Sequence, residues 1–300
     1  MIRRLFSTTR FQSHERQYLN AIRDIIETGD HQVGRNGNTF RKIGITMRFS
    51  LENGTLPLIT TKKLAWRTCL KELLWFISGS TDNKTLQDQS VHIWDGNASI
   101  EAMQARGLSH YLPGDLGPIY GHQWRSFNAP YTHSGDDYAG KGVDQLADLV
   151  RRLKDPEERY SRRNLLLAWN PSQIDQMALP PCHVLSQFHV TQENKLTCSM
   201  YQRSGDMGLG IPFNIASYSL LTHLIAVHCN LEAHEFIHFI GDAHIYDDHV
   251  DILKEQIERT PALPPTVVVR PQVCIDDYGV DDFSVSGYRS QGKLEMEMRI

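Results

Sequence analysis

The segment "YQRSGDMGLGIPFNIASYSLL", residues 201–221, decides the fold because it carries a strand into a long apolar helix. Arg203 and Ser204 lie at the expected end of the strand, and Asp206 opens a loop that contains glycines. Asn214 is expected to begin the helix. Polar side chains at a junction of this kind are typical of a site built on a sheet. We therefore predict a binding site where this strand ends.

The hydrophobic pattern of the remaining chain predicts a mixture of helices and strands, because helical spacing favours the former and strict alternation the latter. We expect helices at 18–28, 64–77, 143–153 and 213–229, and strands at 43–51, 163–169, 183–190, 195–202, 231–240, 266–270 and near the C-terminus. The stretches 113–142 and 261–282 are rich in proline, glycine and aspartate and are expected to be long surface loops. This mixed order predicts a single α+β domain, with helices covering a large mixed sheet.

The composition indicates one globular unit. The chain has 300 residues, of which 40% are hydrophobic, so it can bury a sizeable core. A net charge of -4 gives no global reason to expect nucleic acid or a membrane surface as the main partner. Five scattered cysteines, an odd number, favour free thiols in a reducing compartment. No uninterrupted apolar run reaches the roughly 18 residues of a membrane helix, so we expect a soluble protein.

The first thirteen residues, "MIRRLFSTTRFQS", differ from the rest of the chain. They contain three arginines and several hydroxyl groups, and no acidic residue precedes Glu15. This composition is typical of a mitochondrial transit peptide, and a short basic N-terminus that frays is the alternative. We therefore separate residues 1–13 from a folded domain at 14–300. The expected location is cytoplasmic, or mitochondrial if residues 1–13 act as a targeting segment, and a nuclear location is compatible with either.

The segment "HEFIH", residues 234–238, matches the zinc-binding pattern H-E-x-x-H. On a helix, the two histidines would lie on one face. The surrounding "LEAHEFIHFI" instead alternates and is rich in Phe and Ile, which favours a strand. Residues four apart on a strand are about 13 Å apart, whereas a zinc ion binds nitrogen at about 2.1 Å. We therefore favour strand histidines with ordinary hydrogen bonds over a zinc hydrolase.

Cys182 lies between a proline pair and a histidine in "ALPPCHVLSQF", residues 178–188. A free cysteine is most often a small buried hydrophobe. A reactive one needs a nearby cation that lowers the pKa of its thiol. Arg203 could supply this cation, so both interpretations stay open from the residues alone.

Six segments, taken in order along the chain, resemble the thymidylate synthase family. They are "PLITTKKLAWRTCLKELLWFISGST" (57–81), "IWDGN" (93–97), "GDLGPIYGHQWR" (114–125), "LPPCH" (179–183), "YQRSGDMGLGIPFNIASY" (201–218) and "GDAHIYDDHV" (241–250). They span most of the chain after residue 30, and their shared order makes the resemblance specific.

The resemblance implies reductive methylation of dUMP to dTMP, with 5,10-methylenetetrahydrofolate as the donor of the carbon and a hydride, which yields dihydrofolate. Cys182 matches the nucleophile that adds to C6 of the pyrimidine, so the resemblance resolves its role. Thiolate addition makes C5 nucleophilic and replaces one difficult step by two feasible ones. No metal is implied, and no nucleic acid is needed for activity.

Glu72 is a carboxylate among apolar helical neighbours, since Cys69, Trp75 and Phe76 lie three or four residues away. It either reaches solvent or is desolvated, which would raise its pKa into the range of a proton shuttle. The resemblance implies that Glu72 organises proton transfer and that Tyr120 lies near the C5 proton. His183 is expected to support the site from the opposite face of its strand.

Asn214 bears on the choice of base. An amide can accept from N3 and donate to O4 of uracil, whereas cytosine reverses this pattern. An aspartate here would point to the related deoxycytidylate hydroxymethylases, and the preference for dUMP is worth roughly 1 to 3 kcal/mol. An N-cap of the following helix is the structural alternative. The resemblance also implies that His244 and Tyr246 bind the deoxyribose hydroxyl.

The phosphate is expected to bind arginines, because their planar guanidinium groups pair with oxyanions. The resemblance implies Arg35, Arg203 and Ser204 from one subunit, with Arg162 and Arg163 donated by the partner. A solvated charge run is the alternative for the last two. Shared sites require a symmetric homodimer whose sheets pack face to face.

The folate is expected in an apolar slot with a few polar anchors. The matching positions implied by the resemblance are Trp94, Asn97, Asp206, Gly210, Phe213 and the C-terminal Ile300, and Asp206 also belongs to the nucleotide site. A hydroxymethylase on the same scaffold and a nucleotide-binding or RNA-binding module without catalysis are the remaining alternatives.

Overall fold

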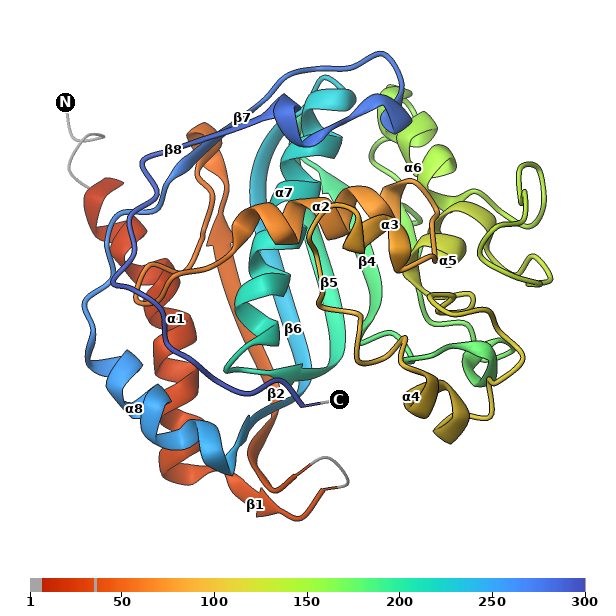
Figure 1. Ribbon diagram of the computed structural model, residues 1–300. Coiled ribbons are helices and arrows are strands. Elements are labelled where there is room, and N and C mark those ends of the chain that lie inside the picture. The colour runs from red at the N-terminus through yellow and green to blue at the C-terminus, as the bar shows by residue number, and fades with distance from the viewer. Residues whose placement is uncertain (1–6, 35–36, 300) are drawn as a thin grey trace.

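The computed structural model describes residues 7–34 and 37–299, with side chains described from His14 onward (Figure 1). The helices are α1 Ser7–Thr28, α2 Trp66–Ile77, α3 Lys84–Gln87, α4 Ile100–Ala105, α5 Tyr120–Ser126, α6 Gln145–Lys154, α7 Gly210–His228 and α8 Val250–Glu258. The strands are β1 Asp30–Gln32, β2 Thr39–Ser50, β3 Leu165–Leu167, β4 His183–Val190, β5 Lys195–Asp206, β6 Glu232–Tyr246, β7 Thr266–Val269 and β8 Phe283–Ser286.

Six strands form one sheet in the order β1-β2-β6-β5-β4-β3. All neighbours are antiparallel except β5 and β6, which run parallel and are joined through α7. The hairpin between β4 and β5 turns at Asn194, whose φ of 57° is tolerated by asparagine. A second sheet contains only β7 and β8. The expected α+β class with a large mixed sheet is confirmed.

Helix α7 is the central helix of the core and packs against β5, β6 and α2. It is apolar on all sides, and a helix of this kind must be buried. By length and composition α7 could cross a membrane, but 78% of that window is buried inside the protein, as in a core helix. Figure 1 shows α2 and α7 in front of the sheet.

The start of α7 differs from the sequence expectation. The helix begins at Gly210, so Asn214 lies inside its first turns and neither begins the helix nor caps it. The carboxylate of Asp206 accepts hydrogen bonds from the backbone N–H groups of Gly208 (2.7 Å) and Leu209 (3.2 Å). These bonds satisfy donors at the helix entry and move its start upstream. The N-cap interpretation of Asn214 is therefore wrong.

The two faces of the large sheet differ in exposure. Alternate residues such as Phe188, Met200 and Phe236 are buried against the helices. On the opposite face the side chain of Tyr201 is 43% exposed, and the paired Phe239 is 39% exposed. This face therefore presents aromatic residues to solvent.

The segment that matches H-E-x-x-H lies within β6, as its alternation predicted. His238 is fully buried and its Nε2 contacts Gln202 Oε1 at 2.8 Å, whereas Nδ1 of His234 contacts Thr197 Oγ1 at 3.2 Å. Strand geometry separates the two histidines too far for one zinc ion.

The N-terminal helix is tied to the segment that precedes α2. The buried Glu15 carboxylate accepts hydrogen bonds from the backbone N–H groups of Thr60 (3.0 Å) and Thr61 (2.8 Å) and from both hydroxyl groups. The α1 helix begins at Ser7, upstream of the expected boundary at residue 14.

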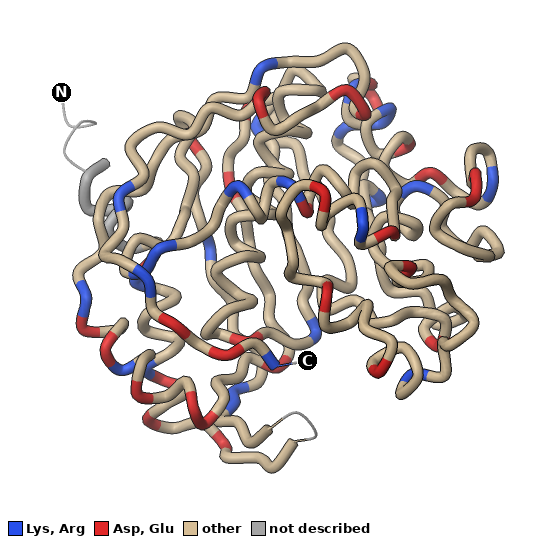
Figure 2. The backbone as a smooth tube through the Cα atoms, in the orientation of Figure 1, with Lys and Arg blue, Asp and Glu red and all other residues tan. Residues whose placement is uncertain are grey.

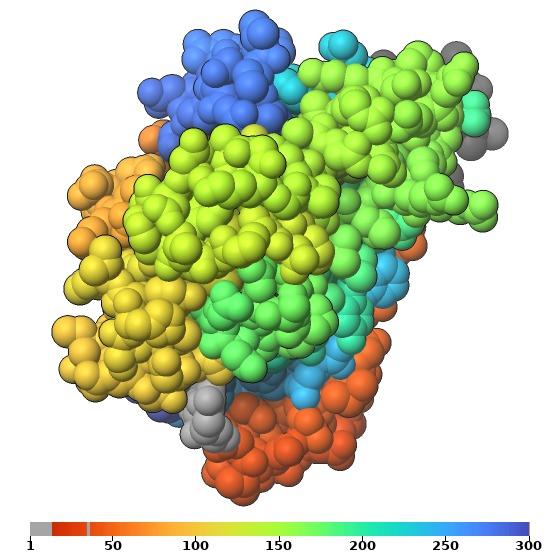
Figure 3. Space-filling view, turned by 90° about the vertical axis from the view of Figure 1, so that its right-hand side faces the viewer, coloured from red at the N-terminus to blue at the C-terminus, as the bar shows by residue number. Residues whose placement is uncertain are grey.

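The surface carries both signs of charge. Figure 2 shows lysine and arginine interspersed with aspartate and glutamate along the described chain. Figure 3 shows the yellow to green segments over the middle of one face, with red N-terminal segments below them and blue C-terminal segments above. Both expected loop stretches contain short regular elements, namely α5 in the first and β7 in the second.

Candidate active site

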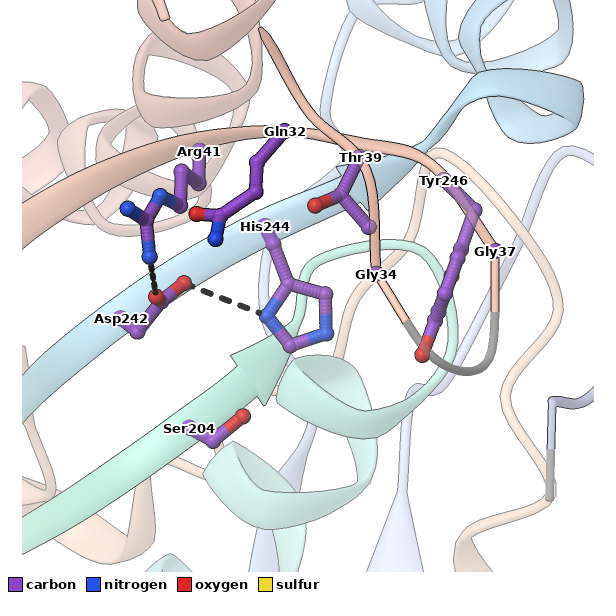
Figure 4. Close-up of a pocket in the computed structure, with 9 residues that line it drawn as sticks. All are labelled: Gln32, Gly34, Gly37, Thr39, Arg41, Ser204, Asp242, His244 and Tyr246. Carbon is purple, nitrogen blue, oxygen red and sulfur yellow. Dashed lines mark hydrogen bonds and ion pairs between the residues drawn. The ribbon is translucent and has the colours of Figure 1, made fainter. Parts of the chain in front are cut away.

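An open cavity of about 290 Å³ lies where β5 and β6 end and β2 begins (Figure 4). It is lined by Gln32, Gly34, Gly37, Thr39, Arg41, Ser204, Asp242, His244 and Tyr246. The register explains the grouping, because Arg41 pairs with His244 across β2 and β6, and Ser204 pairs with Asp242 across β5 and β6. Three of the residues expected for a nucleotide, Ser204, His244 and Tyr246, therefore share one cavity.

Cys182 lies in the short loop before β4, and its backbone is fixed on both sides. Its N–H donates to the Tyr120 hydroxyl at 2.8 Å, and its carbonyl accepts from the backbone N–H of Arg203 at 2.9 Å. The side chain is only partly buried. This loop presents the thiol rather than sealing it in the core.

Arg203 supports the same loop through its guanidinium group. Its Nε donates to the carbonyl of Pro181 and its Nη2 to that of Pro180, both at 2.9 Å. The guanidinium also lies over the ring of Trp169 at 5.5 Å. Burial raises the pKa of Cys182 above its usual value, and the charge of Arg203 opposes this shift without cancelling it. The resting thiol is therefore neutral.

Glu72 occupies the desolvated state that its apolar helical neighbours suggested. Burial raises its pKa to about 7, although the indole Nε1 of Trp94 donates to Oε1 at 2.8 Å and acts in the opposite direction. The ring of Tyr120 stacks on Phe76 one turn along the same helix as Glu72, with centroids 4.6 Å apart. An acid with this pKa can exchange protons near neutral pH.

A buried chain of hydrogen bonds fixes the Asn214 side chain. Nε2 of Gln202 donates to Asn214 Oδ1 at 2.9 Å, and Gln202 Oε1 contacts His238 Nε2 at 2.8 Å. The hydrogen bond from Gln202 identifies the side-chain oxygen of Asn214 as the atom that faces Gln202. The amide nitrogen of Asn214 therefore faces away from Gln202 and can donate a hydrogen bond. Burial lowers the pKa of His238 to about 3, so this histidine is neutral.

His183 lies beside this chain of hydrogen bonds and contacts the Asn214 side chain. Its ring packs against Tyr120 (5.2 Å) and edge-on against Tyr218 (5.0 Å). Burial lowers its pKa to about 4, although a hydrogen bond with the Asn214 side chain acts in the opposite direction. The His183 imidazole is therefore neutral and packed between two aromatic rings.

Sequence reasoning missed Gln202, His238 and Lys62. Lys62 is buried and its ammonium group donates to the carbonyl of Gly208, at the turn that Asp206 caps. Burial lowers the pKa of Lys62 to about 8, and the nearby Asp206 opposes this shift. Of these three residues, only His238 had a signal in the sequence. The alternation around "HEFIH" puts His238 on the same face of the strand as Phe236 and Ile240, which indicates burial.

Two of the positions expected for the folate lie at the start of α7. Gly210 and Phe213 lie in its first turn, and Trp94 is buried against Glu72. A Cβ added to Gly210 would meet its nearest atoms only at 3.8 Å, in Asp206 and Asn214. Asn97 is half-buried, and the role of these residues in folate binding stays a prediction.

The C-terminal segment runs along the same turn. His249 Nε2 contacts the carbonyl of Glu297 at 2.9 Å, Arg299 pairs with Asp248, and Tyr288 donates to the carbonyl of Ile59 at 2.9 Å. A Cβ on Gly208 would lie 3.0 Å from the sulfur of Met296. The tail is therefore packed against the entry of α7.

Of the described arginines expected for the phosphate, none lines the cavity, and Arg203 instead binds the carbonyl groups before Cys182. Arg35 and Ile300 lie outside the described residues. Arg162 and Arg163 are exposed in the loop before β3. The arginine that lines the described cavity is Arg41, which was not predicted from the sequence.

The fold and site define an α+β protein with an open cavity at the ends of β5 and β6 and a partly buried cysteine in the loop before β4. The sequence model of the family "Thymidylate synthase" matches residues 16–300. A thymidylate synthase of Equine herpesvirus 2 is 49% identical over 288 residues, which is 95% of this chain and 98% of that protein. The chain belongs to the thymidylate synthase family.

Two further relatives are longer. A bifunctional dihydrofolate reductase-thymidylate synthase of Zea mays is 51% identical over 97% of this chain and 56% of that protein. A probable thymidylate synthase of Schizosaccharomyces pombe is 48% identical over 98% of this chain and 49% of that protein. The chain thus spans about half the length of several curated relatives that it matches.

Proposed function

We propose that this protein catalyses the reductive methylation of dUMP to dTMP. The observation that carries the proposal is the Cys182 loop, fixed by Tyr120 and Arg203 next to the oriented Asn214, in a chain of this family. 5,10-Methylenetetrahydrofolate supplies the one-carbon unit and a hydride, and leaves as dihydrofolate.

Cys182 acts as the nucleophile. Its sulfur bonds to C6 of the uracil, and the electron pair of the C5–C6 double bond moves toward C5 and O4, so that C5 becomes nucleophilic. C5 bonds to the one-carbon unit of the folate, and loss of the C5 proton then releases the tetrahydrofolate and leaves an exocyclic methylene group on C5. The released folate gives a hydride to this methylene carbon and becomes dihydrofolate, and the sulfur–C6 bond breaks so that the thiolate leaves and the methylated base is formed. The resting thiol of Cys182 is neutral and therefore a weak nucleophile. The positive charge of Arg203 lowers the pKa of this thiol and favours the reactive thiolate.

Glu72 and Tyr120 serve the proton transfers. Glu72 has a pKa of about 7, so it can give a proton to water near O4 and take it back at neutral pH. Burial raises the pKa of Tyr120 well above its usual value, so its hydroxyl stays protonated. That hydroxyl fixes the Cys182 backbone, and the proposal places it near the C5 proton.

Asn214 selects uracil. Its amide nitrogen donates to O4 and its oxygen accepts from N3–H, using the second lone pair beside the Gln202 bond. Ser204, His244 and Tyr246 bind the sugar and phosphate from the cavity. Arg203 and Arg35 complete the phosphate site from the same chain, with Arg162 and Arg163 from a second copy.

The test is turnover by Cys182→Ser, measured by the formation of dTMP and dihydrofolate. We expect a loss of at least about 10³-fold with nearly unchanged dUMP binding, because only the covalent step is removed. Cys274→Ser is the matched control, since that cysteine is exposed and its sulfur contacts Asp276, which is not among the expected site residues, so the variant should keep full turnover. Near-normal turnover in Cys182→Ser would refute the mechanism, and a 5-hydroxymethyl product would identify a hydroxymethylase instead.

A further inference from the structure

Three side chains form a chain of contacts on the wall of the cavity. Arg41 Nη1 donates to Asp242 Oδ2 at 2.9 Å, and Asp242 Oδ1 lies 3.5 Å from His244 Nδ1. Figure 4 shows Asp242 between the guanidinium group and the imidazole ring, with both contacts drawn as dashed lines. The Asp242 carboxylate is therefore shared, with one oxygen facing each neighbour.

This arrangement determines which ring nitrogen of His244 faces the cavity. An ionised carboxylate only accepts hydrogen bonds, so the His244 nitrogen that faces Asp242 is the one that carries hydrogen. In the neutral ring the other nitrogen, Nε2, is then an acceptor. Figure 4 shows this second nitrogen on the side of Tyr246, where the ring borders the cavity.

Arg41 holds the carboxylate in this orientation. It lies directly across from His244 in the pairing of β2 and β6, so its side chain reaches Asp242 within the same face of the sheet. Both partners are about one-third exposed, at 35% and 29%, so the pair is only partly screened by water. Nε of Arg41 is buried and has no hydrogen-bond partner in the described part of the chain.

We propose that Arg41 and Asp242 are positioning residues that hold His244 in the tautomer whose Nε2 accepts a hydrogen bond from the 3′-hydroxyl of the nucleotide sugar. The inference rests on the proposed function and deepens it, because it names the device that makes the site select a 3′-hydroxyl. A sugar without this group leaves the oriented acceptor without a partner.

The test compares two ligands on each protein by isothermal titration calorimetry. They are dUMP and 2′,3′-dideoxyuridine 5′-monophosphate, which differ only in the 3′-hydroxyl. We expect the wild-type protein to prefer dUMP by roughly 3- to 10-fold, the worth of one hydrogen bond. In Asp242→Ala and Arg41→Met this ratio should fall toward one, whereas Arg41→Lys, which can still pair with Asp242, should keep part of it.

A matched ion pair joins the same two strands away from the cavity. Arg48 contacts Glu235 through Nε at 3.0 Å. Arg48→Met and Glu235→Ala should leave the ratio unchanged, and His244→Ala should abolish it. Adding Asp242→Ala to His244→Ala should then have no further effect on the ratio.

The ratio is measured on one protein preparation, so a partly unfolded sample changes both affinities equally. A wild-type ratio retained in Asp242→Ala would overturn the inference, as would an equal loss of affinity for both ligands. Turnover of dUMP by the wild-type protein is measured alongside. If the wild type converts dUMP and the variants keep the ratio, the inference alone fails; if it neither binds nor converts dUMP, the proposed function fails.

Discussion

At the scale of single residues, burial sets the charge of the site. Burial raises the pKa of both Cys182 and Glu72, so both groups are shifted toward their neutral forms. The sequence predicted a raised pKa for Glu72 as one of two outcomes, because its helical neighbours are apolar. It could not predict that Trp94 would donate to the carboxylate, because Trp94 follows an intervening loop whose path depends on tertiary packing.

The Glu72 shift predicts a specific dependence of stability on pH. An acid whose folded-state pKa lies above its ordinary value binds its proton more tightly in the folded chain, so the free energy of unfolding falls as pH rises from about 4.5 to about 7. Glu72→Gln removes this loss. We expect the variant to gain about 3 kcal/mol relative to wild type on going from pH 4 to pH 8.

Urea unfolding at several pH values measures this difference. Glu101→Gln, at an exposed position, serves as the control and should follow the wild-type dependence. The same dependence on pH in the wild type and in Glu72→Gln would show that Glu72 titrates in its ordinary range and would contradict this prediction.

Asn214 shows where sequence reasoning at the residue scale reached its limit. Its amide chemistry suggested a uracil contact, but the residues that orient it, Gln202 and His238, are 12 and 24 positions away in the chain. Strand pairing brings them together, and pairing partners follow from topology rather than from local pattern. Only the burial of His238 could be foreseen, from the alternation of its strand.

At the scale of elements, long periodic segments were predicted well and short buried ones were missed. The alternation around residues 231–240 placed H-E-x-x-H in a strand, which β6 confirms. The expected loop at 113–142 instead contains α5, in which six of the seven residues are buried. A short helix buried on nearly all sides has no amphipathic period, so its residues carry no helical signal.

The attachment of α1 gives the prediction at this scale. Glu15 satisfies two buried backbone N–H groups and two hydroxyl groups at Thr60 and Thr61. Glu15→Ala leaves these donors without partners and should lower the free energy of unfolding by roughly 2 to 4 kcal/mol. Chemical denaturation measures the loss.

Glu27→Ala, at an exposed position of the same helix, is the control and should change the free energy by less than about 0.5 kcal/mol. Equal effects of the two substitutions would show that the Glu15 bonds add nothing beyond a surface side chain.

At the scale of the whole molecule, the open face of the sheet supports the proposed homodimer. Tyr201 and Phe239 are adjacent on this face and substantially exposed, and exposed aromatic patches mark interaction surfaces. The exposed Arg162 and Arg163 lie outside the cavity of their own chain, as the donation of phosphate ligands to a second copy requires. The fold class followed from the sequence, whereas shared sites followed only from the family resemblance.

Shared sites predict complementation between inactive variants. Cys182→Ser and the double variant Arg162→Ala with Arg163→Ala should each have little activity. After the two are mixed and allowed to exchange subunits, activity should recover to roughly a quarter of the wild-type value, because half of the dimers are mixed and each has one complete site. Activity that stays at the level of the separate variants would contradict a shared site.

The most direct test of the central claim is intact-mass measurement after incubation with 5-fluoro-dUMP and 5,10-methylenetetrahydrofolate. Fluorine replaces the proton at C5 and cannot be removed as a cation, so the reaction stops after C5 is substituted. The account therefore predicts a stable adduct that contains protein, nucleotide and folate, and peptide mapping should place it on Cys182. An unmodified protein mass, or an adduct on one of the other four cysteines, would contradict the claim that Cys182 adds to the pyrimidine.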